Sequence, residues 1–190
     1  MLLELARPFA YLTIQHRSRL PKWVNWIMPV VVSVIAVALP WALDIHVNIY
    51  GDSGVISRVL GFVQSLAGFY IAALAAIATF NNPDMDKLMP GEAPTMQVYY
   101  NAAMTTVKVT RRRFLSSMFA YLTACSLVLT LISIMALAVA QPLAVALPSQ
   151  LLVVVKTAFI VAYLMVLSQM ICVTLWGLYY LGERIHTPDA

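Results

Sequence analysis

The chain has 190 residues, of which 62% are hydrophobic and 11% are charged, and its mean hydropathy is +0.83. Charged residues make up about a quarter of an ordinary soluble protein, so this composition excludes a soluble globular fold and predicts an integral membrane protein. The net charge of +4 suggests nucleic-acid binding at first sight. The basic residues, however, gather at predicted membrane boundaries and therefore indicate topology.

Four apolar segments are long enough to cross a membrane as helices: 24–43, 55–80, 114–140 and 151–181. A helix of about 20 residues, rising about 1.5 Å per residue, covers the ~30 Å hydrocarbon core. Trp23 and Trp41 lie near the ends of the first segment, at the headgroup level that indole rings prefer. We therefore predict an all-α fold, in which residues 1–190 form one membrane domain, an integral membrane four-helix bundle. Residues 1–22 are expected to form an interfacial helix before the first span.

The second span carries small residues three and four positions apart: Gly61, Ser65, Gly68, Ala72 and Ala76. On a helix this spacing forms one smooth ridge, and small residues let the backbones of two membrane helices approach closely. Van der Waals packing then drives association, because the hydrophobic effect does not act between helices in lipid. We predict that this ridge joins copies of the chain into a homo-oligomer.

A polar segment, 81–113, separates the second span from the third. Asn82, Pro83 and Asp84 supply a cap, a proline at the first helical position and an early acid, which together predict a short helix. From Thr95 onward the chain contains no helix breaker. We therefore predict that a helix begins there and continues into the third span.

On that helix four residues would share one stripe: Met96, Tyr99, Ala103 and Val107. Three arginines come directly before the third span: Arg111, Arg112 and Arg113. Methionine adapts its shape to a partner, and tyrosine combines contact area with a hydroxyl group. We predict that the stripe and the arginines dock a cytosolic protein partner. The alternative interpretation of the arginines is that they are stop-transfer charges facing anionic lipid headgroups.

Ten of the twelve lysines and arginines fall on one side of the four-span arrangement, and only Arg58 and Lys156 fall on the other. Because positive residues favour the cytoplasmic side, both termini and the segment 81–113 are predicted to be cytoplasmic. The predicted location is the bacterial inner membrane, as a multi-pass protein with its N- and C-termini inside.

No carboxylate or histidine lies near the middle of any span. Proton-coupled transporters, intramembrane proteases and membrane oxidases need such groups at membrane depth, so we predict no enzymatic activity, no cofactor and no metal. Asp44, His46 and Asp52 share one loop, where solvation explains them better than metal binding does. Four polar span residues remain: Gln64, Ser168, Gln169 and Thr174. They either line a narrow polar path in an oligomer or form hydrogen bonds between helices.

The overall plan resembles that of small four-span inner-membrane proteins encoded in bacterial phage-defence loci, most nearly the membrane subunit of Kiwa-type systems. The resemblance covers the length, the four spans, the two cytoplasmic ends and the cytosolic segment, and it assigns no role to any single residue. It implies a homo-oligomeric membrane sensor that binds no nucleic acid directly and works with a cytosolic nucleic-acid-binding partner. Two hypotheses remain: a non-enzymatic sensor or scaffold in antiviral defence, and a homo-oligomeric channel or pore.

Overall fold

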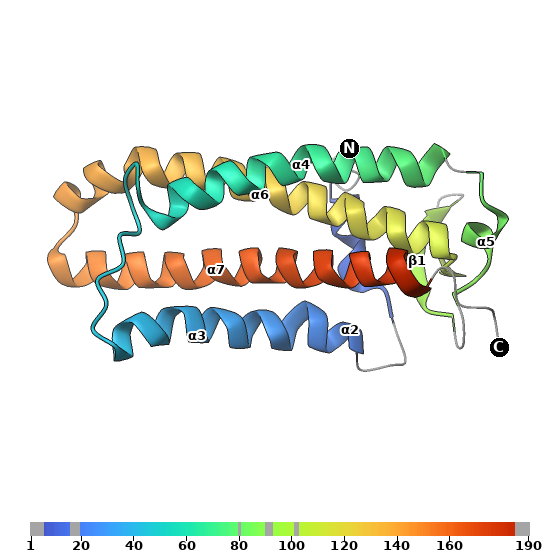
Figure 1. Cartoon of the computed structure of the whole chain (residues 1–190), viewed down its shortest axis with the longest axis horizontal. Helices are drawn as coiled ribbons and strands as arrows, with labels where there is room; N and C mark the ends of the chain where they lie inside the picture. Colours follow the sequence, from blue (N-terminus) through green and yellow to red (C-terminus); the bar gives the residue numbers. More distant parts are fainter. Residues whose placement is uncertain (1–5, 16–19, 80, 90–92, 101–102, 185–190) are drawn as a thin grey trace.

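The computed structural model describes residues 6–15, 20–79, 81–89, 93–100 and 103–184, and four long helices dominate it (Figure 1). The elements, in chain order, are η1 (Arg7–Thr13), α2 (Leu20–Lys22), η2 (Trp23–Ile27), α3 (Met28–Ala42), α4 (Val55–Thr79), α5 (Pro83–Asp86), β1 (Thr95–Tyr100), β2 (Ala103–Lys108), α6 (Arg111–Ala146), α7 (Ser149–Tyr179) and η3 (Tyr180–Arg184). Four helical stretches are long and apolar enough to cross a membrane: Trp23–Ala42, Val55–Thr79, Arg111–Ala146 and Ser149–Gly182. The prediction of four candidate spans is confirmed.

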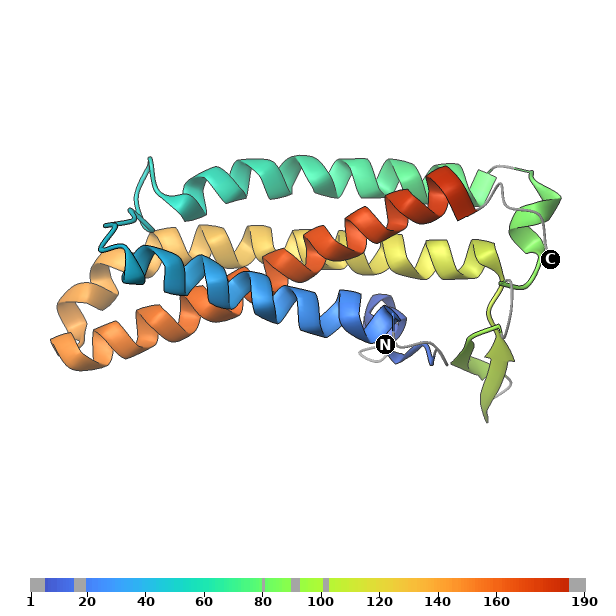
Figure 2. The same cartoon turned by 60° about the horizontal axis from the view of Figure 1, so that its bottom comes forward.

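The four long helices form two packed pairs. Helix α4 lies along α6, α3 lies along α7, and α6 and α7 also pack on each other (Figures 1 and 2). The loop 43–54 and the turn 147–148 lie at one end, called the loop end here. The short helix α5 and the strands β1 and β2 lie at the other, called the hairpin end (Figure 2).

The tightly packed core occupies the half of the bundle nearer the hairpin end. Every buried residue of α6 lies between Arg111 and Ser133, and every buried residue of α7 lies between Ile160 and Gly177. The core includes Tyr70, Phe114 and Met170, none of which exposes any surface. Beyond these residues, toward the loop end, α6 and α7 carry no buried side chain. The bundle is therefore compact in one half and loosely packed in the other.

The segment that follows Pro94 differs from its prediction. Strands β1 and β2 pair antiparallel, with a register that runs from Thr95 opposite Lys108 to Tyr100 opposite Ala103. The prediction of a helix from Thr95 onward is therefore wrong, and the fold is mostly helical with one hairpin rather than all-α. The hairpin sequence is rich in threonine, valine and tyrosine. The β-branched threonine and valine lose χ1 rotamers in a helix, and all three residue types pack well on a pleated strand.

The third span also runs further than predicted. Helix α6 continues past Ala140, through Pro142, and ends at Ala146, so that only Leu147 and Pro148 separate it from α7. Proline removes one backbone hydrogen bond but does not have to end a helix in a membrane protein. At about 1.5 Å per residue the 36 residues of α6 span roughly 54 Å. That length exceeds the ~30 Å hydrocarbon core, so α6 is tilted or projects beyond it.

Candidate functional site

The short helix α5 begins as its sequence predicts. The Asn82 side chain accepts a hydrogen bond from the Asp84 backbone N–H at 2.9 Å, and Pro83 occupies the first helical position. Met85 is only 6% exposed, so it anchors α5 to the core. The prediction of a short capped helix is confirmed, and α5 gives the hairpin end a fixed starting point.

The base of the hairpin is bonded to two other segments. Gln15 and Thr95 exchange both backbone hydrogen bonds, at 2.9 and 3.2 Å. Val109, which follows β2 and is fully buried, donates its N–H to the Pro94 carbonyl at 2.9 Å and accepts one from Met89 at 3.3 Å. A two-stranded hairpin is only marginally stable alone. These contacts fix its base to the N-terminal segment and to the chain after α5.

The three consecutive arginines have three different environments. Arg111 is only 2% exposed, and its backbone N–H donates to the Lys87 carbonyl at 3.0 Å. Arg112 is half-buried and ion-paired, whereas Arg113 is exposed. Successive helical residues point about 100° apart, so three neighbours in sequence do not form one patch. Of the three, Arg113 has the side chain most accessible to a docking partner.

Arg112 links three elements. Its Nε donates to Asp86 Oδ1 at 2.7 Å, its Nη2 donates to Asp86 Oδ2 at 3.2 Å, and its Nη1 donates to the Ile77 carbonyl at 2.7 Å. The Ile77 carbonyl belongs to the last turn of α4, where helix carbonyls lack partners in the helix and favour a cation. Arg112 therefore joins the start of α6 to the end of α4 and to α5.

The Arg112 hydrogen bond also lowers the pKa of the Asp86 carboxyl group, and a bond from Lys87 lowers that of Asp84. A carboxyl group whose folded pKa is lowered stabilises the fold above its unfolded pKa, and this contribution is lost as the pH falls through the folded value. Both aspartates are exposed, so water screens these pairs strongly. We infer that they orient α5 rather than add much stability.

The stripe predicted for partner docking is not a helical face. Met96 lies opposite Val107 in the hairpin, and both are half-buried, with Met96 packed against the core. Tyr99 lies opposite Met104, and Ala103 lies opposite Tyr100. The side chains of Tyr99 and Ala103 are outside the described part of the structure. Because strand positions alternate between faces, positions 96 and 99, an odd number apart, do not belong to one face.

The outer parts of the hairpin are polar and accessible. Gln97, Thr105, Thr106 and Lys108 are exposed. Among the described residues, the outer edge of β1 is bridged only at Thr95, to Gln15, and the outer edge of β2 has no bridge. Open strand edges present backbone groups to which an extended peptide can add as a further strand. Sequence reasoning missed this surface because it assigned the segment to a helix.

The small-residue ridge of α4 faces away from the rest of the chain. Gly61, Ser65, Gly68 and Ala72 are exposed, and Ala76 is partly exposed. A Cβ atom added at Gly61 or Gly68 would meet no atom within 4 Å. At about 100° per residue, the ridge lies opposite the face of α4 that packs on α6, which includes Val63, Tyr70 and Ile77. The structure therefore leaves the ridge unused within one chain.

A buried hydrogen-bonded cluster joins the first and last spans. The Gln169 Nε2 donates to the Asn25 backbone carbonyl at 2.8 Å, and Gln169 Oε1 accepts from the Tyr121 hydroxyl at 2.8 Å. Tyr11 donates to the Asn25 side chain at 3.2 Å. Asn25 lies in the π-helical turn η2, and Pro29, four residues further along the chain, has no N–H to donate to its carbonyl. Gln169 donates to this carbonyl from a neighbouring helix.

Two of the other polar span residues are also used inside the chain. The Ser168 and Ser33 hydroxyl oxygens lie 3.5 Å apart, and the Thr174 hydroxyl oxygen lies 2.6 Å from the Tyr70 hydroxyl oxygen. Of the two interpretations of these residues, hydrogen bonds between helices are observed for Ser168, Gln169 and Thr174. Gln64, by contrast, is exposed near the middle of α4. Of the four residues that the pore hypothesis needs, only Gln64 therefore has an exposed side chain that could line a path between copies.

Among the described residues, no three histidine, cysteine, aspartate or glutamate side chains gather where they could hold a metal ion. No family model, no curated protein and no solved structure matches the chain.

Proposed function

We propose that this chain is a non-enzymatic membrane sensor or scaffold. We further propose that it acts in bacterial antiphage defence, like the four-span membrane proteins that its overall plan resembles. It assembles with copies of itself and recruits a soluble protein at its hairpin end. The observation that supports this most is the attached hairpin: an accessible strand pair whose base is bonded to Gln15, just after η1, and to the segment after α5. A connector between two spans needs none of these bonds. Fixed strands lose less conformational entropy on binding than a flexible loop does.

The hairpin end is proposed to be cytoplasmic. Lys22, Lys87, Lys108 and the three arginines lie there, whereas Arg58 and Lys156 lie toward the loop end. This bias favours a cytoplasmic hairpin end under the positive-inside rule. Reporter fusions within residues 84–93 and near Asn48 would measure the orientation, and a cytoplasmic signal near Asn48 would contradict it.

Docking is proposed to use the open edges and the exposed polar face of the hairpin. We expect Thr106→Lys to reduce recovery of the partner at least about fivefold, because a lysine on a strand edge opposes strand addition and central contacts cost about 1 kcal/mol or more when lost. The partner is first identified by mass spectrometry after purification of the wild type in mild detergent. It is then purified and bound again to each variant.

Thr13→Lys is the matched control, because Thr13 is an exposed threonine at the same end but outside the hairpin. We expect it to bind the partner as the wild type does. Arg113→Gln should weaken binding at low salt more than at high salt, since exposed charges are screened over about 8–10 Å at physiological salt. Equal binding by the Thr106→Lys and Thr13→Lys variants would show that the hairpin is only a connector.

Self-assembly is proposed to use the ridge of α4. Gln64 lies beside this ridge, and an amide at membrane depth gains a hydrogen-bonding partner when a second copy packs there. We expect Gly68→Leu and Ala72→Leu to shift assembly to at least about tenfold higher protein concentration, since a bulky side chain forces the backbones apart at a cost of about 1–3 kcal/mol. Light scattering after size-exclusion chromatography in detergent measures the shift.

Ala78→Leu is the control for the ridge variants. Ala78 is exposed on the same helix, about 120° around it from Ala72. It should leave assembly unchanged. If all three variants assemble as the wild type does, the contact between copies lies on another surface.

A further inference from the structure

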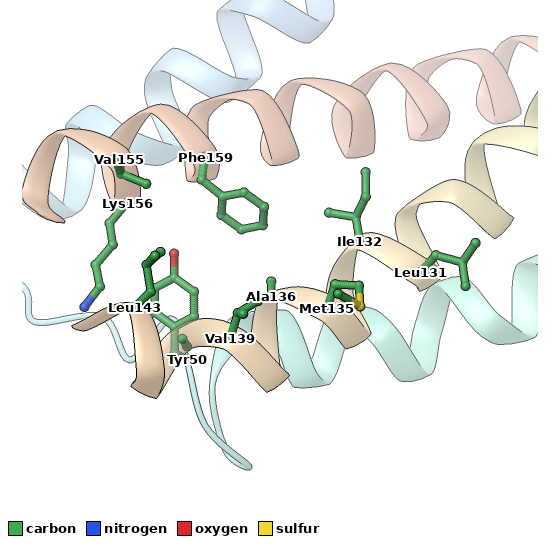
Figure 3. A pocket seen from close by; sticks show the side chains of 11 residues that line it. Tyr50, Leu131, Ile132, Met135, Ala136, Val139, Leu143, Val155, Lys156 and Phe159 are labelled. Atoms are coloured by element: carbon green, nitrogen blue, oxygen red, sulfur yellow. The ribbon is translucent and has the colours of Figure 1, made fainter. Parts of the chain in front are cut away.

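An apolar groove opens in the loosely packed half of the bundle. It has a volume of about 350 Å³ and is lined by side chains of α6 and α7, with Tyr50 of the loop 43–54 closing one end (Figure 3). Met135 and Val139 face it from α6, and Val155 and Phe159 face it from α7. The groove exists because α6 and α7 bury no side chains against each other in this half.

The lining is apolar except at one end, where Lys156 and Tyr50 stand together (Figure 3). The Lys156 Nζ lies 5.5 Å from the centroid of the Tyr50 ring. That ring stacks on Phe159 with a centroid distance of 6.5 Å and an interplanar angle of 29°. The rings of Phe159 and Tyr50 thus form a continuous aromatic surface from the groove to the Lys156 ammonium group. Lys156 is half-buried, and Arg58 is the only other lysine or arginine in the described part of the loop-end half.

A second hollow, of about 290 Å³, adjoins the groove and shares Tyr50 and Lys156 with it. Its lining adds the polar residues Asn48 and Thr157, both of which are exposed. The two hollows together present an apolar compartment and a mixed compartment that carries polar groups, with a single cation at their boundary. An amphiphile with a long apolar chain and an anionic head has the same division.

We propose that this composite site binds an anionic phospholipid of the leaflet at the loop end. One acyl chain fills the groove, the phosphate pairs with Lys156, and the rest of the headgroup contacts Asn48 and Thr157. The groove lies on helices long enough to cross the membrane, so lipid is the ligand at highest local concentration.

Charge removal tests the headgroup contact. The wild type in neutral detergent is titrated with phosphatidylglycerol and with phosphatidylcholine of the same acyl chains, and native mass spectrometry measures bound lipid. We expect the wild type to prefer phosphatidylglycerol and Lys156→Gln to weaken its binding about fivefold, since one lysine at a membrane surface contributes about that factor. Binding of phosphatidylcholine should not change. Arg58→Gln, the control at the same end, should keep the wild-type preference.

Filling the groove tests the acyl-chain contact. Ala136 lines the groove, whereas Ala138 is exposed on the same helix and does not line it. Ala136→Phe should weaken binding of both lipids, and Ala138→Phe should weaken neither. Glycerol phosphate, which lacks acyl chains, should not bind measurably. Thermal unfolding and oligomer size are compared first, and the Lys156→Gln titration decides the question if Ala136→Phe does not fold.

The proposal fails if Lys156→Gln keeps the full preference for phosphatidylglycerol, or if a folded Ala136→Phe variant binds lipid as the wild type does. Tight binding of glycerol phosphate alone would overturn it in favour of a simple anion site. A change of oligomer size in Ala136→Phe, with lipid binding unchanged, would overturn it in favour of a contact between copies.

Discussion

Gln169→Met is expected to lower the free energy of unfolding by about 1–3 kcal/mol. The substitution keeps the length and flexibility of the side chain but removes its amide, so the Asn25 carbonyl and the Tyr121 hydroxyl both lose the partner they have at 2.8 Å. Hydrogen bonds between membrane helices contribute about 0.6 kcal/mol on average and up to about 1.7 kcal/mol each. Two such bonds, with a buried carbonyl left unsatisfied, give the expected range.

Gln141→Met is the matched control, because Gln141 is exposed near the end of α6. Surface substitutions usually change stability by less than about 0.5 kcal/mol. Both variants are unfolded reversibly from mixed micelles by a denaturing detergent, at protein concentrations where the chain is monomeric. Equal stability of the two variants would show that the amide of Gln169 contributes nothing to the fold.

A double-mutant cycle with Pro29→Ala makes this test sharper. Alanine restores a backbone N–H at residue 29, which can donate to the Asn25 carbonyl when the π-helical turn η2 relaxes to an α-helix. We therefore expect Gln169→Met to cost less in the Pro29→Ala chain than in the wild type. Additive effects would show that Gln169 does not replace the donor missing at Pro29.

Much of the fold could be predicted because its strongest signals are local. Long apolar runs are required for crossing the membrane, and the cap at Asn82 followed by Pro83 is a local helix start. The segment from Met96 to Val107 was ambiguous for a physical reason. Its apolar residues fit a helical spacing, but short segments often fit a strand as well, and its many β-branched residues favoured the strand.

The candidate site depended on contacts that sequence spacing does not encode. Asn25 and Gln169 are 144 positions apart, so no local pattern connects them, although Pro29 already indicated an unsatisfied carbonyl four residues earlier. The different environments of Arg111, Arg112 and Arg113 could have been predicted from the sequence. A helix turns about 100° per residue, so their side chains point in different directions. Their partners, such as Asp86 and the Ile77 carbonyl, required the structure.

Close helix packing within the chain occurs at Gly177, which the sequence analysis did not single out. Gly177 is buried on α7, and a Cβ atom added there would lie 2.5 Å from the Met118 Cε and 3.9 Å from the Phe119 Cζ, both on α6. Met118 itself is fully buried, so the end of its side chain can make way only for a small group. The glycine thus allows α6 and α7 to approach in the compact half of the bundle.

Gly177→Leu is expected to lower the free energy of unfolding by about 1–3 kcal/mol or more, because overpacking a filled core forces side chains out of their rotamers or separates the helices. Gly177→Ala should cost less, since the nearest atom is the end of a flexible methionine and can yield to one methyl group. The graded series Gly, Ala, Leu, measured by the same unfolding in mixed micelles, reports how tightly the two helices pack.

Gly68→Leu is the control, because no atom lies within 4 Å of a Cβ at that position. In monomeric conditions we expect it to unfold as the wild type does, even though it impairs assembly at higher concentration. The two glycines would therefore separate two kinds of packing: we expect Gly177 to affect the fold of one chain, and Gly68 to affect the proposed contact between chains. A destabilised Gly68→Leu variant would mean that α4 packs inside the chain through its ridge. An unchanged Gly177→Leu variant would mean that α6 and α7 do not pack closely at Gly177.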